Sequence, residues 1–255
     1  IDAEPAFKRL AQGWLNELYE DLEELTNRAE VAISNGEAIS LGYLGNIVDL
    51  LEFLVDRQIT PHLMSDQTSL HNPWLGGYIP VGYTLEEGLI LIRDNPERFK
   101  ELVQESLIRH VSAINKLTER GTKFWDYGNA FLLESSRAGA EILSDDGSFT
   151  YPSYVEDIMG PMCFDFGFGP FRWVCTSGKI EDLRATDRIA IEVLEKLCSS
   201  CPEEVKTQYI DNIKWISEAE KHELVVGSKA RILYADELGR KIIATEFNNA
   251  ISSGL

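Results

Sequence analysis

Residues 38–57 read AISLGYLGNIVDLLEFLVDR, and this stretch decides the fold. The short apolar run 38–43 predicts a buried strand, and the segment Gly42-Tyr-Leu-Gly45-Asn46 predicts a tight turn. Apolar residues at helical spacing then predict a helix from Ile47 to Arg57, and a second short strand is expected at 61–66. This order of strand, turn, helix and strand is typical of an α/β protein with parallel strands.

The alternation of helices and strands continues along the rest of the chain. Thr84-x-x-Glu87 is a capping box that starts a helix, and Asn95-Pro96 ends it and starts a longer helix to about Arg120. Further helices are expected at 6–34, 129–143, 180–199, 203–222 and from 240, and further strands at 123–127, 171–176 and 230–235. We therefore expect a Rossmann-like, mostly parallel sheet with helices on both faces.

An irregular stretch rich in glycine and proline covers residues 144–170. Such composition is common at domain boundaries, so we expect a first region at 1–143 and a second lobe at 144–255.

Composition and charge exclude several classes of protein. Hydrophobic residues make up 44% of the 255 positions and charged residues 26%, as in ordinary globular proteins. The net charge of −18 repels phosphate backbones, so we expect no nucleic acid as partner. No apolar run is long enough to span a membrane, so no membrane partner is expected either. Four cysteines are too few for a disulfide scaffold, which favours a reducing compartment such as the cytoplasm.

The densest polar cluster is Asp66-Gln-Thr-Ser-Leu-His71-Asn-Pro73, directly after the strand expected at 61–66. It begins a loop over 67–83 that is long for a compact domain and carries three aromatic residues. Ligands of α/β proteins bind beyond the carboxyl ends of the strands, which favours a ligand site. An ordinary solvated turn explains the cluster equally well.

Three weaker patterns also stay open between a functional and a structural interpretation. Gly42-x-x-Gly45-Asn46 could hold a phosphate at the start of a helix, or could simply be a tight turn. In Asp126-Tyr-Gly-Asn129, Tyr127 could contact a ligand, or Asn129 could simply cap the following helix. Arg172, beside Phe171 and Trp173, could bind a carboxylate through its two-pronged guanidinium or pair with one of the many acidic residues.

Metal chemistry and nucleophilic catalysis have no support in the sequence. Cys198-Ser-Ser-Cys201 lacks the second cysteine pair that a zinc site needs, and it follows a helical run rather than starting a helix. Of the four histidines only His71 lies in a polar cluster, while core or surface roles are expected for His62, His110 and His222. We therefore expect no metal.

Several of these motifs, taken in order, resemble the urocanase family, and more closely its animal-like branch. The resemblance rests on Leu41-Gly-Tyr-Leu-Gly45-Asn46, Asp66-Gln-Thr-Ser-Leu-His71-Asn-Pro with Gly76-Gly-Tyr78-Ile-Pro80-Val, Phe124-Trp-Asp-Tyr127-Gly-Asn-Ala-Phe-Leu-Leu-Glu, Gly169-Pro-Phe-Arg172-Trp-Val-Cys-Thr-Ser-Gly178 and Ala230-Arg-Ile-Leu-Tyr234. It extends over the whole chain.

The resemblance implies a hydro-lyase of histidine catabolism that adds water to urocanate and gives imidazolonepropionate. In that family tightly bound NAD⁺ acts as the electrophile and is not consumed. By motif match, the residues expected to bind NAD are Asn46, Ile47, Gln67, Thr68, Ser69, Leu70, His71, Tyr78, Ile79 and Tyr127. Arg172 is our own candidate for the urocanate carboxylate, and the full-length protein is expected to be a homodimer.

The resemblance also implies that this chain is the central fragment of such an enzyme. The glycine-rich NAD turn is expected before Ile1, and the acid–base aspartate after Leu255, so the catalytic residue is unknown here. Many bacterial members carry a cysteine where this chain has Leu233. Region 1–143 would then be an incomplete NAD-binding region, and 144–255 would lead into the C-terminal domain. A catalytically silent nucleotide-binding or assembly fragment is the alternative.

Overall fold

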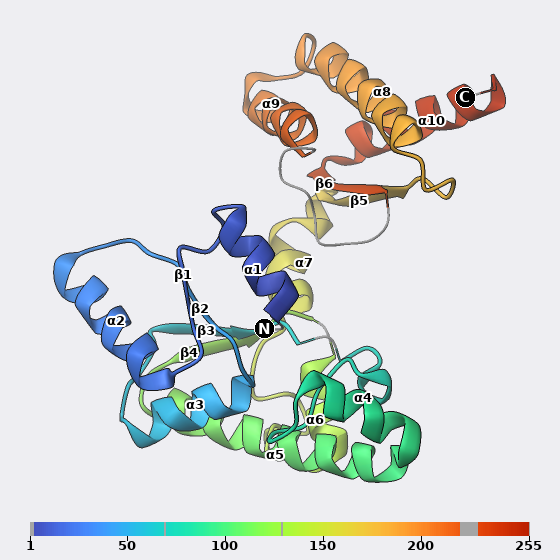
Figure 1. The fold of residues 1–255 in the computed structure, drawn as a ribbon. Helices are drawn as coiled ribbons and strands as arrows, with labels where there is room; N and C mark the ends of the chain where they lie inside the picture. Colours follow the sequence, from blue (N-terminus) through green and yellow to red (C-terminus); the bar gives the residue numbers. More distant parts are fainter. Residues whose placement is uncertain (1–2, 69, 129, 220–228, 255) are drawn as a thin grey trace. The chain divides into compact units, whose positions relative to one another are not determined.

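The computed structural model describes residues 3–68, 70–128, 130–219 and 229–254, and the chain divides after Ile158 into two compact units (Figure 1). The division lies within the irregular stretch 144–170. Ser69, Asn129 and His222, which the sequence singled out, lie outside the described residues.

The first unit alternates helices with short strands. Its elements are α1 (Ala3–Ala11), β1 (Glu17–Tyr19), α2 (Leu22–Asn35), β2 (Leu41–Tyr43), α3 (Ile47–Asp56), β3 (Leu63–Asp66), the short helix η1 (Pro73–Leu75), α4 (Leu85–Asp94), α5 (Pro96–Glu119), β4 (Lys123–Asp126) and α6 (Phe131–Ala138), with η2 (Tyr154–Met159) at its end.

The strands of the first unit form two parallel pairs. β1 pairs with β2, and β3 pairs with β4 in a register that sets Asp66 beside Asp126. Figure 1 shows β3 and β4 side by side, with the long helix α5 next to them. Parallel strands separated by helices confirm the predicted α/β class.

The second unit contains α7 (Gly160–Met162), η3 (Phe164–Phe166), β5 (Gly169–Val174), α8 (Ile180–Cys198), α9 (Glu203–Glu218), β6 (Ala230–Ala235) and α10 (Glu237–Ser252). β5 and β6 pair antiparallel, which the sequence did not predict. Its core gathers Leu194, Tyr209 and Ile243, all nearly free of solvent contact. None of the described helices of either unit is both long and apolar enough to cross a membrane.

Local signals placed many elements correctly. Asn46 caps α3, the capping box of Thr84 and Glu87 starts α4, and Asn95 caps α5. The helix expected at 6–34 is wrong, because the chain breaks it at Gly13, whose φ is +73°, and forms β1 before Asp21 caps α2.

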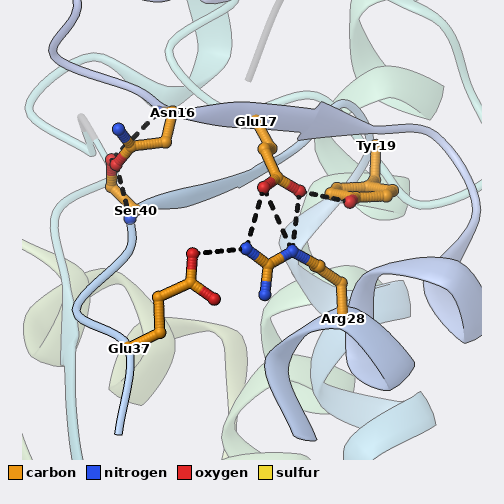
Figure 2. A network of polar contacts seen from close by, with 6 residues as sticks. All are labelled: Asn16, Glu17, Tyr19, Arg28, Glu37 and Ser40. Atoms are coloured by element: carbon orange, nitrogen blue, oxygen red, sulfur yellow. Dashed lines mark hydrogen bonds and ion pairs between the residues drawn. The ribbon is translucent and has the colours of Figure 1, made fainter. Parts of the chain in front are cut away.

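A polar network holds α2 against the first strand pair (Figure 2). The guanidinium of Arg28 donates to both carboxylate oxygens of Glu17, at 3.0 and 3.1 Å, and to Glu37 at 2.7 Å. Asn16 Oδ1 accepts from the amide and the hydroxyl of Ser40, at 2.9 and 2.7 Å. These side chains bond to one another, so the network has a structural role.

The core of the first unit is built on α5. Its buried residues recur every three or four positions, which gives the helix one apolar face: Phe99, Val103, Leu107, Val111, Ile114 and Leu117. Residues of α3 and α6 pack against this face. His110 lies in the same buried row, and it is the residue that connects the core to the candidate site.

Candidate functional site

Asn46 anchors the candidate site. Its Oδ1 accepts a hydrogen bond from the amide of Val48 at 2.9 Å and so caps α3. Its Nδ2 donates to the carbonyl oxygen of Ile79 at 3.1 Å. One side chain therefore closes the start of a helix and holds the returning end of the loop 67–83 against it.

The glycines before Asn46 leave room for neighbouring side chains, which would have to shift if either glycine carried a Cβ atom. A Cβ atom at Gly42 would lie 2.6 Å from Leu15 Cδ2, and one at Gly45 would overlap the ring of Tyr43. Neither glycine has a positive φ. This favours the structural interpretation of the Gly42-x-x-Gly45 spacing over a phosphate-binding loop.

A pocket of about 690 Å³ lies beside Asn46, within the size range of sites for cofactors and small ligands. Five of the predicted cofactor-binding residues line it: Asn46, Ile47, Thr68, Tyr78 and Ile79. The rest of the lining is Ala3, Leu44, Gly45, Gly76, Gly77, Tyr83, Thr84 and Leu85. The long loop is therefore part of a pocket wall.

Asp66 organises the polar turn after β3. Its side chain is buried, at 5% exposure, and its Oδ1 accepts from the amide of Thr68 at 3.0 Å and from the Thr68 hydroxyl. An aspartate that binds the amide two residues ahead fixes the backbone of the turn. Thr68 is thereby held in the wall of the pocket.

A buried row of polar side chains connects Asp66 through His110 to Tyr78, which lines the pocket. His110 Nε2 lies 3.7 Å from Asp66 Oδ2, and His110 Nδ1 lies 3.2 Å from the hydroxyl of Tyr78. All three side chains are at most 5% exposed. The hydroxyl of Tyr78 is therefore engaged inside the core.

Burial determines which of the side chains of Asp66, His110 and Tyr78 carry a proton. It lowers the pKa of His110 to about 3, so the imidazole is neutral at pH 7. Burial also raises the pKa of Asp66, although the two hydrogen bonds from Thr68 lower it in part. It raises the pKa of Tyr78 as well. A neutral imidazole satisfies both neighbours when the Tyr78 hydroxyl donates to Nδ1 and the Nε2 proton faces Asp66.

The other predicted residues lie outside the lining of this pocket. Gln67 and His71 are exposed, and Leu70 is a core residue at 1% exposure. Tyr127 is half-buried and stacks on Tyr154, with ring centroids 5.3 Å apart. Burial removes the side chain of Leu70 from direct contact with a ligand, so only its backbone could take part.

Sequence reasoning missed two residues of the site. A core or surface role was expected for His110, and its 1% exposure confirms the core role, but its two polar partners from distant segments were not predicted. Asp126 was seen only as part of a strand-end motif, although it is buried beside Asp66. The available signal was that both aspartates end a strand directly before a polar turn.

We expect the two bonds of Asn46 to be separable by mutation. Asn46→Ala removes both the cap and the tie to Ile79, and should lower the free energy of unfolding by about 2 kcal/mol. Asn46→Ser retains a capping oxygen but is too short to reach Ile79, so about 1 kcal/mol should be lost. Urea unfolding measures both, and equal losses would show that the tie to Ile79 contributes nothing.

Arg172 lies on β5 of the second unit, and its side chain is exposed. Phe171 and Trp173 pack on Phe247 in the core, at ring distances of 6.4 and 5.2 Å. Neighbouring strand residues point to opposite faces, so the side chain of Arg172 points away from the face on which Phe171 and Trp173 pack. Within the described part of the chain, no ion pair involves Arg172.

The cysteines of the chain form no disulfide. Cys163, Cys175, Cys198 and Cys201 are all free thiols and half-buried. Among the described residues no group of His, Cys, Asp and Glu side chains is arranged to hold a metal ion.

Paired parallel strands, the helices between them and a pocket at the start of α3 define an α/β protein of the Rossmann-like class. Comparison with known families agrees. Residues 1–158 match the Urocanase Rossmann-like domain, and residues 161–255 match the Urocanase C-terminal domain. The chain belongs to the urocanase family, which confirms the resemblance inferred from its motifs.

Curated relatives are similar over almost the whole chain. A probable urocanate hydratase of Caenorhabditis elegans is 55% identical over 97% of this chain and 38% of its own length. The urocanate hydratases of Mus musculus and Homo sapiens are 52% and 51% identical, over 100% and 99% of this chain and 39% and 38% of their own lengths. The chain thus spans less than two fifths of the length of these relatives.

Proposed function

We propose that this chain is the part of a urocanate hydratase that binds NAD⁺ and helps to bind urocanate. The complete enzyme would add water to urocanate, in histidine catabolism, and give imidazolonepropionate. One observation carries the proposal: five motif-matched residues from separate segments line one pocket of about 690 Å³. The names of the similar proteins support the activity.

The pocket fits part of a dinucleotide in its chemistry. Asn46 and Thr68 place polar groups in the wall, while Tyr78 and Ile79 provide an apolar surface for a flat ring. Gly76 and Gly77 keep the wall free of bulky side chains. Bound NAD⁺ would supply an electron-withdrawing ring that makes the substrate susceptible to water.

Gln67, Ser69, Leu70, His71 and Tyr127 remain proposed NAD contacts on the strength of the motif match. Gln67 and His71 are exposed and follow the buried Asp66, so a ligand at this strand end could reach them. Leu70 would contribute only its backbone, because its side chain is buried in the core. Tyr127 offers a ring that is already stacked on Tyr154.

We propose Arg172 as the group that binds the urocanate carboxylate, and Arg172→Lys tests it. A local cation must offset the net charge of −18, and an ammonium lacks the two-point geometry of a guanidinium. In the full-length protein we expect KM for urocanate to rise about tenfold or more, in line with the loss of one charged hydrogen bond. NAD content and melting temperature should stay constant, because the side chain is exposed.

Lys179→Arg is the matched control for that substitution, since Lys179 lies in the same unit and directly before α8. It should leave KM unchanged. A normal KM in Arg172→Lys, with a lower melting temperature, would assign Arg172 a structural role instead.

The proposed function as a whole is tested in two measurements on the full-length protein. Mass spectrometry of the denatured, purified protein should detect released NAD, and the absorbance of urocanate should fall when the native protein is added. Absence of both would favour the alternative, a catalytically silent nucleotide-binding or assembly fragment. The cytoplasm as location and the homodimer as assembly are further proposals, which fractionation and size-exclusion chromatography test.

A further inference from the structure

Two buried aspartates lie next to each other at the carboxyl ends of β3 and β4. The strands are parallel, and Asp66 and Asp126 are direct partners in their register. In-register residues of a parallel pair point to the same face, so the carboxyl groups are neighbours. Asp66 is 5% exposed and Asp126 3% exposed. Two carboxylates this close and this deeply buried do not both ionise at low cost.

The partners of the two carboxyl groups differ. Asp66 Oδ1 accepts two hydrogen bonds from Thr68, and Asp66 Oδ2 faces the Nε2 of His110. The two bonds from Thr68 stabilise the carboxylate form of Asp66. The Asp126 carboxyl accepts hydrogen bonds from the backbone amides of Gly128 and Tyr127, but its Oδ1 is buried without a hydrogen-bond partner among the residues that the structure describes. Asp126 thus has one buried carboxyl oxygen without a partner, and this oxygen is the place where a proton would cost least.

We propose that Asp66 and Asp126 share one proton, that it resides on Asp126, and that Asp126 is thereby a hydrogen-bond donor for a ligand at the carboxyl end of β4. In other close pairs of carboxyl groups, one proton is likewise retained by the pair because two neighbouring negative charges repel each other. The identity of the ligand rests on the proposed function, whereas the shared proton does not depend on it.

The electrostatic surroundings agree with this assignment. Burial, together with the charge of Asp66, raises the pKa of Asp126 to about 6, while the amides of Gly128 and Tyr127 and the imidazole of His71 act in the opposite direction. The other titratable groups near the pair are His110 from α5, and Glu156 and Asp157 from the segment that follows β4 and α6.

Asp126 lines a second pocket, of about 520 Å³, that shares no residue with the first. Its polar lining includes Ser148, Thr150 and Ser153, with Glu156 and Asp157 at one side. Acidic residues repel an anion, so the acceptor should be a neutral oxygen of a carbonyl or carboxamide. A protonated carboxylic acid donates to such an oxygen without adding charge.

Infrared spectroscopy of the full-length protein tests the shared proton directly. A carboxylic acid carbonyl band, assigned by ¹³C labelling of aspartate, should be present at pH 5 and disappear with a midpoint near 6. The isosteric Asp126→Asn should lack the band. Asp157→Asn, an exposed carboxylate in the lining of the same pocket, should retain it. A band that survives in Asp126→Asn, or no band at any pH above 5, would overturn the proposal.

The donor role is tested in the same experiment at pH 5, where Asp126 carries its proton, with NAD⁺ as the probe. Between preparations without and with NAD⁺, the Asp126 band should shift to lower frequency, because a new hydrogen bond weakens the carbonyl. An unchanged band would overturn the donor role. Failure of the proposed function is a separate result: a protein that neither retains NAD nor consumes urocanate could still show the pH-dependent band.

Discussion

Replacing His110 with alanine is expected to lower the free energy of unfolding by about 3 kcal/mol or more. The imidazole is 1% exposed and packs on Phe131 with ring centroids 4.8 Å apart, so its removal leaves a cavity in the core. The hydroxyl of Tyr78 also loses its partner in a buried place. Urea unfolding of the variant measures the sum of both effects.

Two conservative variants separate the polar role of His110 from its packing. Asparagine places an acceptor near the position of Nδ1 and should retain the bond to Tyr78, whereas glutamine reaches the position of Nε2 and should retain the contact with Asp66. Combined with Tyr78→Phe, each gives a double-mutant cycle. Zero coupling energy between positions 78 and 110 would mean that the 3.2 Å contact does not stabilise the protein.

The parts of the fold that the sequence predicted are those governed by local contacts. The caps at Asn46, Thr84 and Asn95 each depend on residues within three positions, so their helices could be placed from sequence. The break between α1 and α2 could not, because the apolar residues on both sides continue the helical spacing. There β1 is stabilised by pairing with β2, more than twenty residues later.

For the candidate site, too, the sequence predicted the residues of local motifs but not the contacts between distant segments. Asn46, Thr68 and Tyr78 were chosen through motifs, and they do line one pocket because Asn46 binds the backbone of Ile79. His110 was missed because its role depends on tertiary contacts with segments more than thirty residues away. The pairing of Asp66 with Asp126 follows from strand register, which the hydrophobic pattern of two four-residue strands does not determine.

The buried groups of this site should act on stability in opposite directions as the pH changes. For His110 the folded pKa, about 3, lies below the value of about 6.5 in the unfolded chain. Between these values the unfolded state binds more protons, so its contribution to stability decreases as the pH falls. For Asp126 the folded pKa, about 6, lies above the unfolded value of about 3.9, so its contribution decreases as the pH rises through that interval.

Asp126→Asn should therefore change the pH dependence of stability as well as its magnitude. At pH 8 the native protein holds an ionised, buried Asp126, whereas the amide is neutral and has the same shape. The variant should be more stable than the native protein at pH 8 by up to about 3 kcal/mol, which corresponds to a pKa difference of about two units. At pH 4 the advantage should vanish, because Asp126 is then protonated in the folded protein.

Comparing Asp126→Asn with His110→Phe shows whether both groups set the pH profile. Between pH 4 and 6 a full proton difference changes the free energy of unfolding by about 1.4 kcal/mol per pH unit. Opposite slopes from His110 and Asp126 should partly cancel and leave the native protein with a shallow profile. Asp126→Asn retains only the histidine contribution of the two, so its stability should rise more steeply with pH. His110→Phe retains the aspartate contribution, so its stability should fall with pH.

The midpoints of urea unfolding at several pH values measure these profiles. Parallel profiles for all three proteins would show that neither group titrates as its burial requires.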